Sequence, residues 1–191
     1  MRNQHRLHTR IAASFVLVLI FGCATDDVYF EPNMDFGSLQ TVAVLPFQNL
    51  TNQEYASERI RDAFMGRLLA TGAVYVLPPG EVATGIQRTG RIPPAGPSIE
   101  QVKKLGAVLG VDAVITGVVT EYGPIRSGST SANVVSLSLQ MVEISSGLVV
   151  WSASTTRGGI SIWDRFIGGG GEPMNSVTVK VVDDLLDKLF D

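Results

Sequence analysis

The side chains best suited to nucleophilic, redox or metal chemistry are scarce in this sequence. The 191 residues contain one cysteine, Cys23, and two histidines, His5 and His8. If the chain is cleaved before Cys23, the mature part has no imidazole. Ser-His-Asp and Cys-His catalysis are then excluded, as are zinc sites built from histidine or cysteine. We expect no catalytic residue, no metal and no cofactor; a hydrolase using carboxylates alone is the remaining enzyme alternative, but no motif pairs two acids.

The residues before Cys23 have the order of a secretory signal. Arg2, Arg6 and Arg10 form a basic start, and Ile11–Phe21 is an uncharged, mostly apolar run. This run is much shorter than the roughly 20 residues that a membrane-spanning helix needs. Its length is typical of the hydrophobic region of a signal peptide.

The end of the apolar run, Leu19-Ile20-Phe21-Gly22-Cys23, resembles the lipobox of bacterial lipoproteins. The resemblance implies cleavage between Gly22 and Cys23, acylation of Cys23 with fatty acids such as palmitate, and therefore membrane lipid as a partner. Ala24, rather than an aspartate, follows Cys23, which by the same resemblance implies an outer-membrane lipoprotein on the periplasmic face. The alternative is an ordinary secretory signal in which the cysteine falls by chance.

Charge argues against nucleic acid as a partner. Loss of the first 22 residues removes three of 15 basic residues, leaving 12 against 18 acidic residues and a net charge of −6. Lysine and arginine form no cluster beyond the first ten residues, whereas binding to a phosphate backbone needs one.

Hydrophobic periodicity divides the chain into three parts. Residues 1–22 are the expected signal peptide, residues 23–39 the acylated cysteine and a short tether, and residues 40–191 an α/β domain. The tether, extended, spans at most about 55 Å. The patterns predict the order strand, helix, strand, two helices, three strands, helix, which is a mixed β-sheet of about five strands packed by amphipathic helices.

Individual elements are predicted from local signals. Thr41–Phe47 has the β-branched, apolar character of a buried strand, and Thr51-x-x-Glu54 and Ser98-x-x-Gln101 match helix capping boxes. Further strands are expected at Asp112–Tyr122, Asn133–Ile144 and Leu148–Thr156, with a polar connection at Gly123–Ser131. A helix is expected in the tail from Asn175, and Trp151 is expected in the core.

Four stretches together resemble the CsgG-like periplasmic lipoproteins, which include the curli secretion channel and the penicillin-binding-protein activator LpoB. They are VAVLPFQNLTN, RLLATGAVYVL, LGAVLGVDAVITGVVTEY and VEISSGLVVWSAS. The resemblance implies a non-enzymatic structural or accessory component of a secretion or surface-assembly complex, with an envelope protein partner and the option of a homo-oligomer. An LpoB-like regulator that docks on a peptidoglycan synthase is the alternative.

One Gly-rich segment offers candidate contact residues. Ile160, Ile162, Trp163 and Phe166 could contact a membrane or a partner, and the alternative is that they fold back onto the sheet. Acidic residues in the C-terminal helix are spaced poorly for a cation, so we expect a solvated face rather than a metal site. These residues are Asp183, Asp184 and Asp187.

Overall fold

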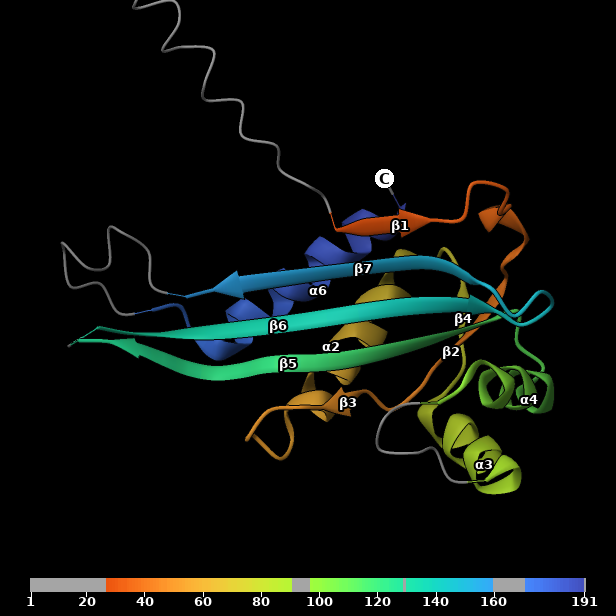
Figure 1. The fold of residues 1–191 in the computed structure, drawn as a ribbon, viewed down its shortest axis with the longest axis horizontal. Helices are drawn as coiled ribbons and strands as arrows, with labels where there is room; N and C mark the ends of the chain where they lie inside the picture. Colours follow the sequence, from red (N-terminus) through yellow and green to blue (C-terminus); the bar gives the residue numbers. More distant parts are fainter. Residues whose placement is uncertain (1–26, 91–96, 129, 160–170, 191) are drawn as a thin grey trace, which may run out of the picture.

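A seven-stranded sheet lies at the centre of the computed structural model, which describes residues 27–90, 97–128, 130–159 and 171–190 (Figure 1). The strands are β1 (Val28–Phe30), β2 (Thr41–Val44), β3 (Gln48–Asn49), β4 (Tyr75–Val76), β5 (Ala113–Ser127), β6 (Thr130–Glu143) and β7 (Val149–Gly158). The helices are α2 (Ala56–Thr71), α3 (Pro79–Thr89), α4 (Ile99–Leu109) and α6 (Met174–Phe190), and η2 (Phe36–Ser38) is a short 3-10 turn.

The sheet is mixed, as the sequence predicts. Its strand order is β1-β7-β6-β5-β2-β4, and β3 also pairs with β5. β2 runs parallel to β4 and β5, whereas the β5, β6, β7 and β1 pairs are antiparallel. The α/β prediction is therefore confirmed, with two more strands than expected, β1 and β3.

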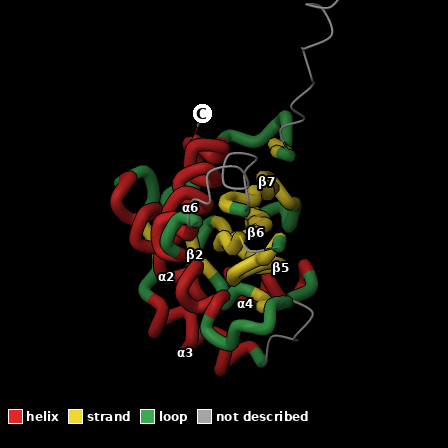
Figure 2. Tube along the Cα trace, turned by 90° about the vertical axis from the view of Figure 1, so that its left-hand side faces the viewer, coloured by secondary structure: helices red, strands yellow, loops and turns green. Residues whose placement is uncertain are grey.

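Helices cover both faces of the sheet. α2 and α6 pack on one face of the sheet (Figure 2). Phe64 of α2 and Leu185 of α6 belong there to one core cluster with strand side chains such as Ile115 and Leu139. α3 and α4 pack on the other face of the sheet, against the strand side chains that alternate with these, among them Val114. Because successive strand residues point to opposite faces, the first half of β5 is buried on both.

The first expected strand, Thr41–Phe47, ends earlier than predicted, and a second short strand follows it. The ladder of β2 ends at Val44, and Pro46 supplies no N–H for further pairing. The chain resumes as β3 farther along β5, where Gln48 lies opposite Val118. The half-buried Arg61 side chain donates to the Val44 carbonyl at 2.7 and 3.2 Å, which satisfies this strand end.

The segment Gly123–Ser131 is not the simple connection that its composition suggests. β5 and β6 stay paired as far as Ser127 and Thr130, so the two strands are longer than expected. Pro124 is tolerated because, in the described ranges, no strand pairs with the outer side of β5 beyond Val119.

One of the two capping boxes forms. Ser98 and Gln101 bond reciprocally at 2.9 and 3.3 Å before α4, as predicted. The prediction of a capping box at Thr51 is wrong, because α2 begins at Ala56 without a side-chain cap. The Thr51 hydroxyl instead donates to Asn49 Oδ1 at 2.8 Å, so a local loop interaction competes successfully with the cap.

The stretch expected as a tether is partly folded onto the sheet. β1 pairs with β7, with Val28 opposite Ala153 and Phe30 opposite Trp151. Trp151 is fully buried, as predicted, and its indole N–H donates to the Lys188 carbonyl at 3.2 Å. In the described part, folded structure therefore reaches back to β1. No described helix is both long and apolar enough to cross a bilayer.

We predict that Gly117→Ala lowers the free energy of unfolding by about 1–3 kcal/mol, the usual effect of overpacking a core. A Cβ at this position would lie 2.7 Å from both Leu139 Cδ2 and Phe47 Cδ1. Gly66 is the matched control, because it lies on the exposed side of α2 and a Cβ added there would have no neighbouring atom within 4 Å. Gly66→Ala should raise stability by about 0.5–1 kcal/mol. Equal midpoints of the two variants in urea would contradict this packing.

Candidate functional site

The residues that the sequence singles out for anchoring and contact lie outside the described residues. These are Gly22 and Cys23 at the expected cleavage site, and Ile160, Ile162, Trp163 and Phe166 in the Gly-rich segment. Their roles remain predictions.

Gly159 and Glu172 lie on either side of that segment in the sequence, and both bond to Asn133 of β6. The Gly159 N–H donates to the Asn133 carbonyl of β6 at 2.8 Å, and the Asn133 side-chain amide donates to the Glu172 carbonyl at 2.7 Å. Gly158 has a φ of +87°, and a Cβ there would lie 2.1 Å from the Asn133 carbonyl oxygen. Only glycine allows this close approach.

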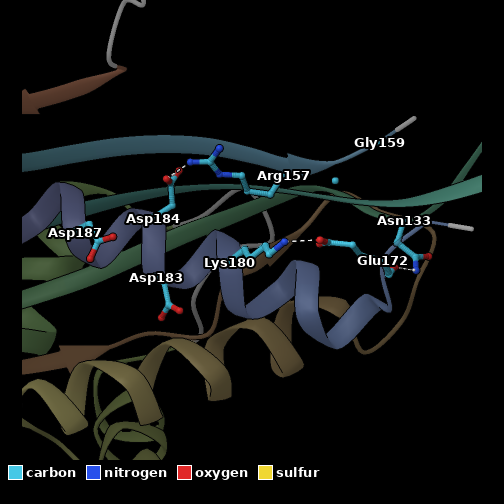
Figure 3. A pocket seen from close by; sticks show the side chains of 10 residues that line it. Asn133, Arg157, Gly159, Glu172, Lys180, Asp183, Asp184 and Asp187 are labelled. Carbon is cyan, nitrogen blue, oxygen red and sulfur yellow. Dashed lines mark hydrogen bonds and ion pairs between the residues drawn. The ribbon is translucent and has the colours of Figure 1, made fainter. Parts of the chain in front are cut away.

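A charged pocket opens beside these residues, between the end of β7 and α6 (Figure 3). Its volume is about 580 Å³. The lining is polar and mostly charged, and consists of Asn133, Arg157, Gly158, Gly159, Gly171, Glu172, Lys180, Asp183, Asp184 and Asp187.

Most charges of this pocket are paired with one another. Arg157 pairs with Asp184, and Lys180 pairs with Glu172 (Figure 3). Asp183 points to α2, where Arg67 holds both of its carboxylate oxygens, with Nε 2.6 Å from Oδ1. This last pair raises the pKa of the Arg67 guanidinium through its hydrogen bond to Asp183.

Asp184 stays ionised at neutral pH. Partial burial raises the pKa of its carboxyl group, but hydrogen bonds from Thr155 and Arg157 and the charges of Arg157 and Lys188 outweigh burial and lower the pKa. A general acid needs the opposite shift. Across the described ranges, no group of three or more His, Cys, Asp or Glu side chains could hold a metal ion. Asp183 and Asp184 of α6 therefore join this helix to α2 and β7.

Apolar side chains collect at the β1 edge of the sheet. Tyr29 and Phe30 of β1 are exposed, and Phe30 packs edge-on against Phe36 with ring centroids 5.6 Å apart. Phe36 and the exposed Phe190 line a small apolar cavity of about 60 Å³. Sequence reasoning missed this cluster, and the only signal for it was the β-prone trio that begins at Val28.

Solved structures share this fold. The PelC dodecamer from Paraburkholderia phytofirmans has a TM-score of 0.57 at 20% identity, covering 86% of this chain and 98% of that one. Lipoprotein GNA1162 from Neisseria meningitidis has a TM-score of 0.56 at 20% identity, covering 78% and 97%. The sheet and its helices thus define an α/β domain of a known fold.

A family model described as peptidoglycan-synthase activator LpoB matches residues 24–156. The chain therefore belongs to the LpoB family. This confirms the LpoB part of the resemblance expected from the sequence and does not confirm the CsgG-like name. Sequence comparison with curated proteins gives no match.

We predict that Asp184→Asn changes how stability depends on pH. Because folding lowers the pKa of this carboxyl group below its ordinary value of 3.8, its stabilising contribution is present above about pH 4 and is lost as the pH falls through the folded-state value. The free energy of unfolding of the wild type should exceed that of the variant by about 1 kcal/mol or less at pH 6, since solvent screens the pair, and by a smaller amount at pH 2.

Urea unfolding at both pH values measures this difference. Asp187→Asn is the matched control, because Asp187 lines the same pocket and makes no ion pair within the described ranges. A stability difference for Asp184→Asn that is as large at pH 2 as at pH 6 would argue against the ion pair as its cause.

Proposed function

We propose that this protein is a non-enzymatic, periplasmic lipoprotein of the outer membrane that docks on a peptidoglycan synthase and stimulates it. The observation that carries the proposal is the LpoB family match, which begins at residue 24, directly after Cys23, and runs to residue 156 in β7. In this proposal Cys23 is acylated after cleavage behind Gly22, and residues 1–22 are the signal peptide.

The proposed mechanism is a shift in the conformational equilibrium of the synthase. A protein that binds the active conformation more tightly than the inactive one raises the ratio of active to inactive enzyme, at saturation, by the ratio of the two affinities. Coupling of about 1–3 kcal/mol corresponds to roughly 5–150-fold. Docking requires a stable surface, and the two-sided core around β5 provides a rigid support for one.

The test is a rate measurement with lipid-linked disaccharide-pentapeptide substrate. We predict that the acylated protein, added to the peptidoglycan synthases of its own bacterium, increases glycan polymerisation by at least one of them several-fold, within the range that such coupling allows. Failure to bind or stimulate any of these synthases would overturn the proposal.

Cys23→Ser separates anchoring from stimulation. The variant should leave the membrane fraction, because its only thiol is lost, and it should still stimulate a detergent-solubilised synthase. Continued membrane association would contradict the proposed lipid anchor, whereas the proposed stimulation of the synthase would still stand.

A second candidate is a structural component of a secretion or surface-assembly complex. The PelC neighbour, which covers 86% of this chain, is a dodecamer. If this chain assembles in the same way, light scattering after size exclusion of the detergent-extracted protein should give a discrete mass many times that of one acylated chain. A monomer would remove this candidate and favour the docking regulator.

A further inference from the structure

The chain between the proposed anchor and the sheet is very short. Five Cα–Cα steps separate Cys23 from Val28, the first residue of β1. Fully extended, they span about 18 Å. If Cys23 carries the lipid, the first residue of β1 therefore lies within about 18 Å of the acylated residue, while the headgroup region of one leaflet alone is roughly 5–8 Å deep. The β1 edge of the domain is thus held at the membrane surface.

The surface at this edge is aromatic. Tyr29 is 46% exposed, Phe30 is 40% exposed and Phe190, at the end of α6, is 47% exposed. The C-terminal end of α6 lies beside β1 in Figure 1 and at the same end of the molecule in Figure 2. Phe36 joins the two parts, since it stacks edge-on with Phe30 and shares the small apolar cavity with Phe190.

We propose that this aromatic edge, formed by Tyr29, Phe30, Phe36 and Phe190, rests on the phospholipid surface and sets the orientation of the domain on the membrane. The inference depends on the acylation of Cys23 in the proposed function. Single exposed aromatic side chains are common on proteins. Here three exposed aromatic residues lie along the edge that the chain length holds near lipid, with Tyr29 and Phe30 on opposite sides of β1. Aromatic rings favour the depth of the headgroups.

Charge around the edge specifies the lipid. Asp27, Glu31 and Asp35 flank the aromatic side chains, and the Tyr29 hydroxyl donates to Glu31 Oε2 at 2.7 Å. Carboxylates repel anionic headgroups and are compatible with the ammonium group of a zwitterionic headgroup. The partner is therefore a zwitterionic phospholipid surface such as phosphatidylethanolamine, and a rising share of anionic lipid should weaken the contact.

The opposite edge of the sheet supplies a matched control. Tyr75 on β4 is 57% exposed and lies at the other end of the strand order from β1. If the β1 edge faces the membrane, Tyr75 faces away from it. A dye at position 75, which is at least as exposed as the aromatic positions of the β1 edge, therefore reports on the aqueous side.

The experiment uses the full, acylated protein in vesicles of phosphatidylethanolamine and phosphatidylcholine. Acylation occupies the only native thiol, so the cysteine of Tyr29→Cys, Phe30→Cys, Phe190→Cys or Tyr75→Cys is a unique site for a nitrobenzoxadiazole dye. Brominated lipids should quench the dye at positions 29, 30 and 190 at least two-fold more than at position 75. Replacing half of the phospholipid by phosphatidylglycerol should reduce this difference.

A second set of variants tests the edge itself. Tyr29→Ser combined with Phe30→Ser should abolish the quenching of the dye at position 190, whereas Tyr75→Ser should leave it unchanged. The mass of the intact protein checks acylation in each sample. Acylated protein with equal quenching at positions 29, 30, 75 and 190 would overturn the inference and leave the proposed function standing. Absence of acylation would overturn both the anchor and this inference.

Discussion

The structure depends on the burial of β5 on both faces over its first half. Ala113, Val114 and Ile115 are completely shielded from solvent, because α2 and α6 cover one face of the sheet and α3 and α4 cover the other. The same residues pair in parallel with β2 and antiparallel with β6. A strand in this position joins the parallel and antiparallel parts of the sheet. The topology, both cores and the placement of the long β5–β6 hairpin therefore all depend on the apolar start of β5, Ala113–Ile115.

Local signals predicted much of this arrangement. The reciprocal bonds of Ser98 and Gln101, the alternation around Leu137 and the burial of Trp151 follow from neighbouring residues alone. β1 could not be found in this way, because three residues flanked by acids form a strand only through pairing with β7. The candidate site has the same limit: Asp184 is visible as a polar helix residue, but its partner Arg157 comes from another element and is brought near by the fold.

The charged groups beside α6 contribute to the structure more than they offer for chemistry. Arg67, Arg157 and Lys180 each neutralise a carboxylate from a different part of the chain, tying α6 to α2, to β7 and to the residues before the helix. Such exposed pairs add little stability individually, but they specify where the helix sits on the sheet.

The pairing of β1 with β7 has a mechanical consequence. A pull on the N-terminus first loads this short ladder, whose register comprises three residue pairs. Peeling away β1 and η2, back to Leu39, would release twelve residues, and extended chain adds about 40 Å at roughly 3.5 Å per residue. The core under α2 and α6 would lose Leu39 together with the partly buried Val28, Met34 and Phe36. The core under α3 and α4 would keep all of its members. The edge strand therefore acts as a length of stored chain, and the force needed to detach it determines how far the domain can travel from its point of attachment.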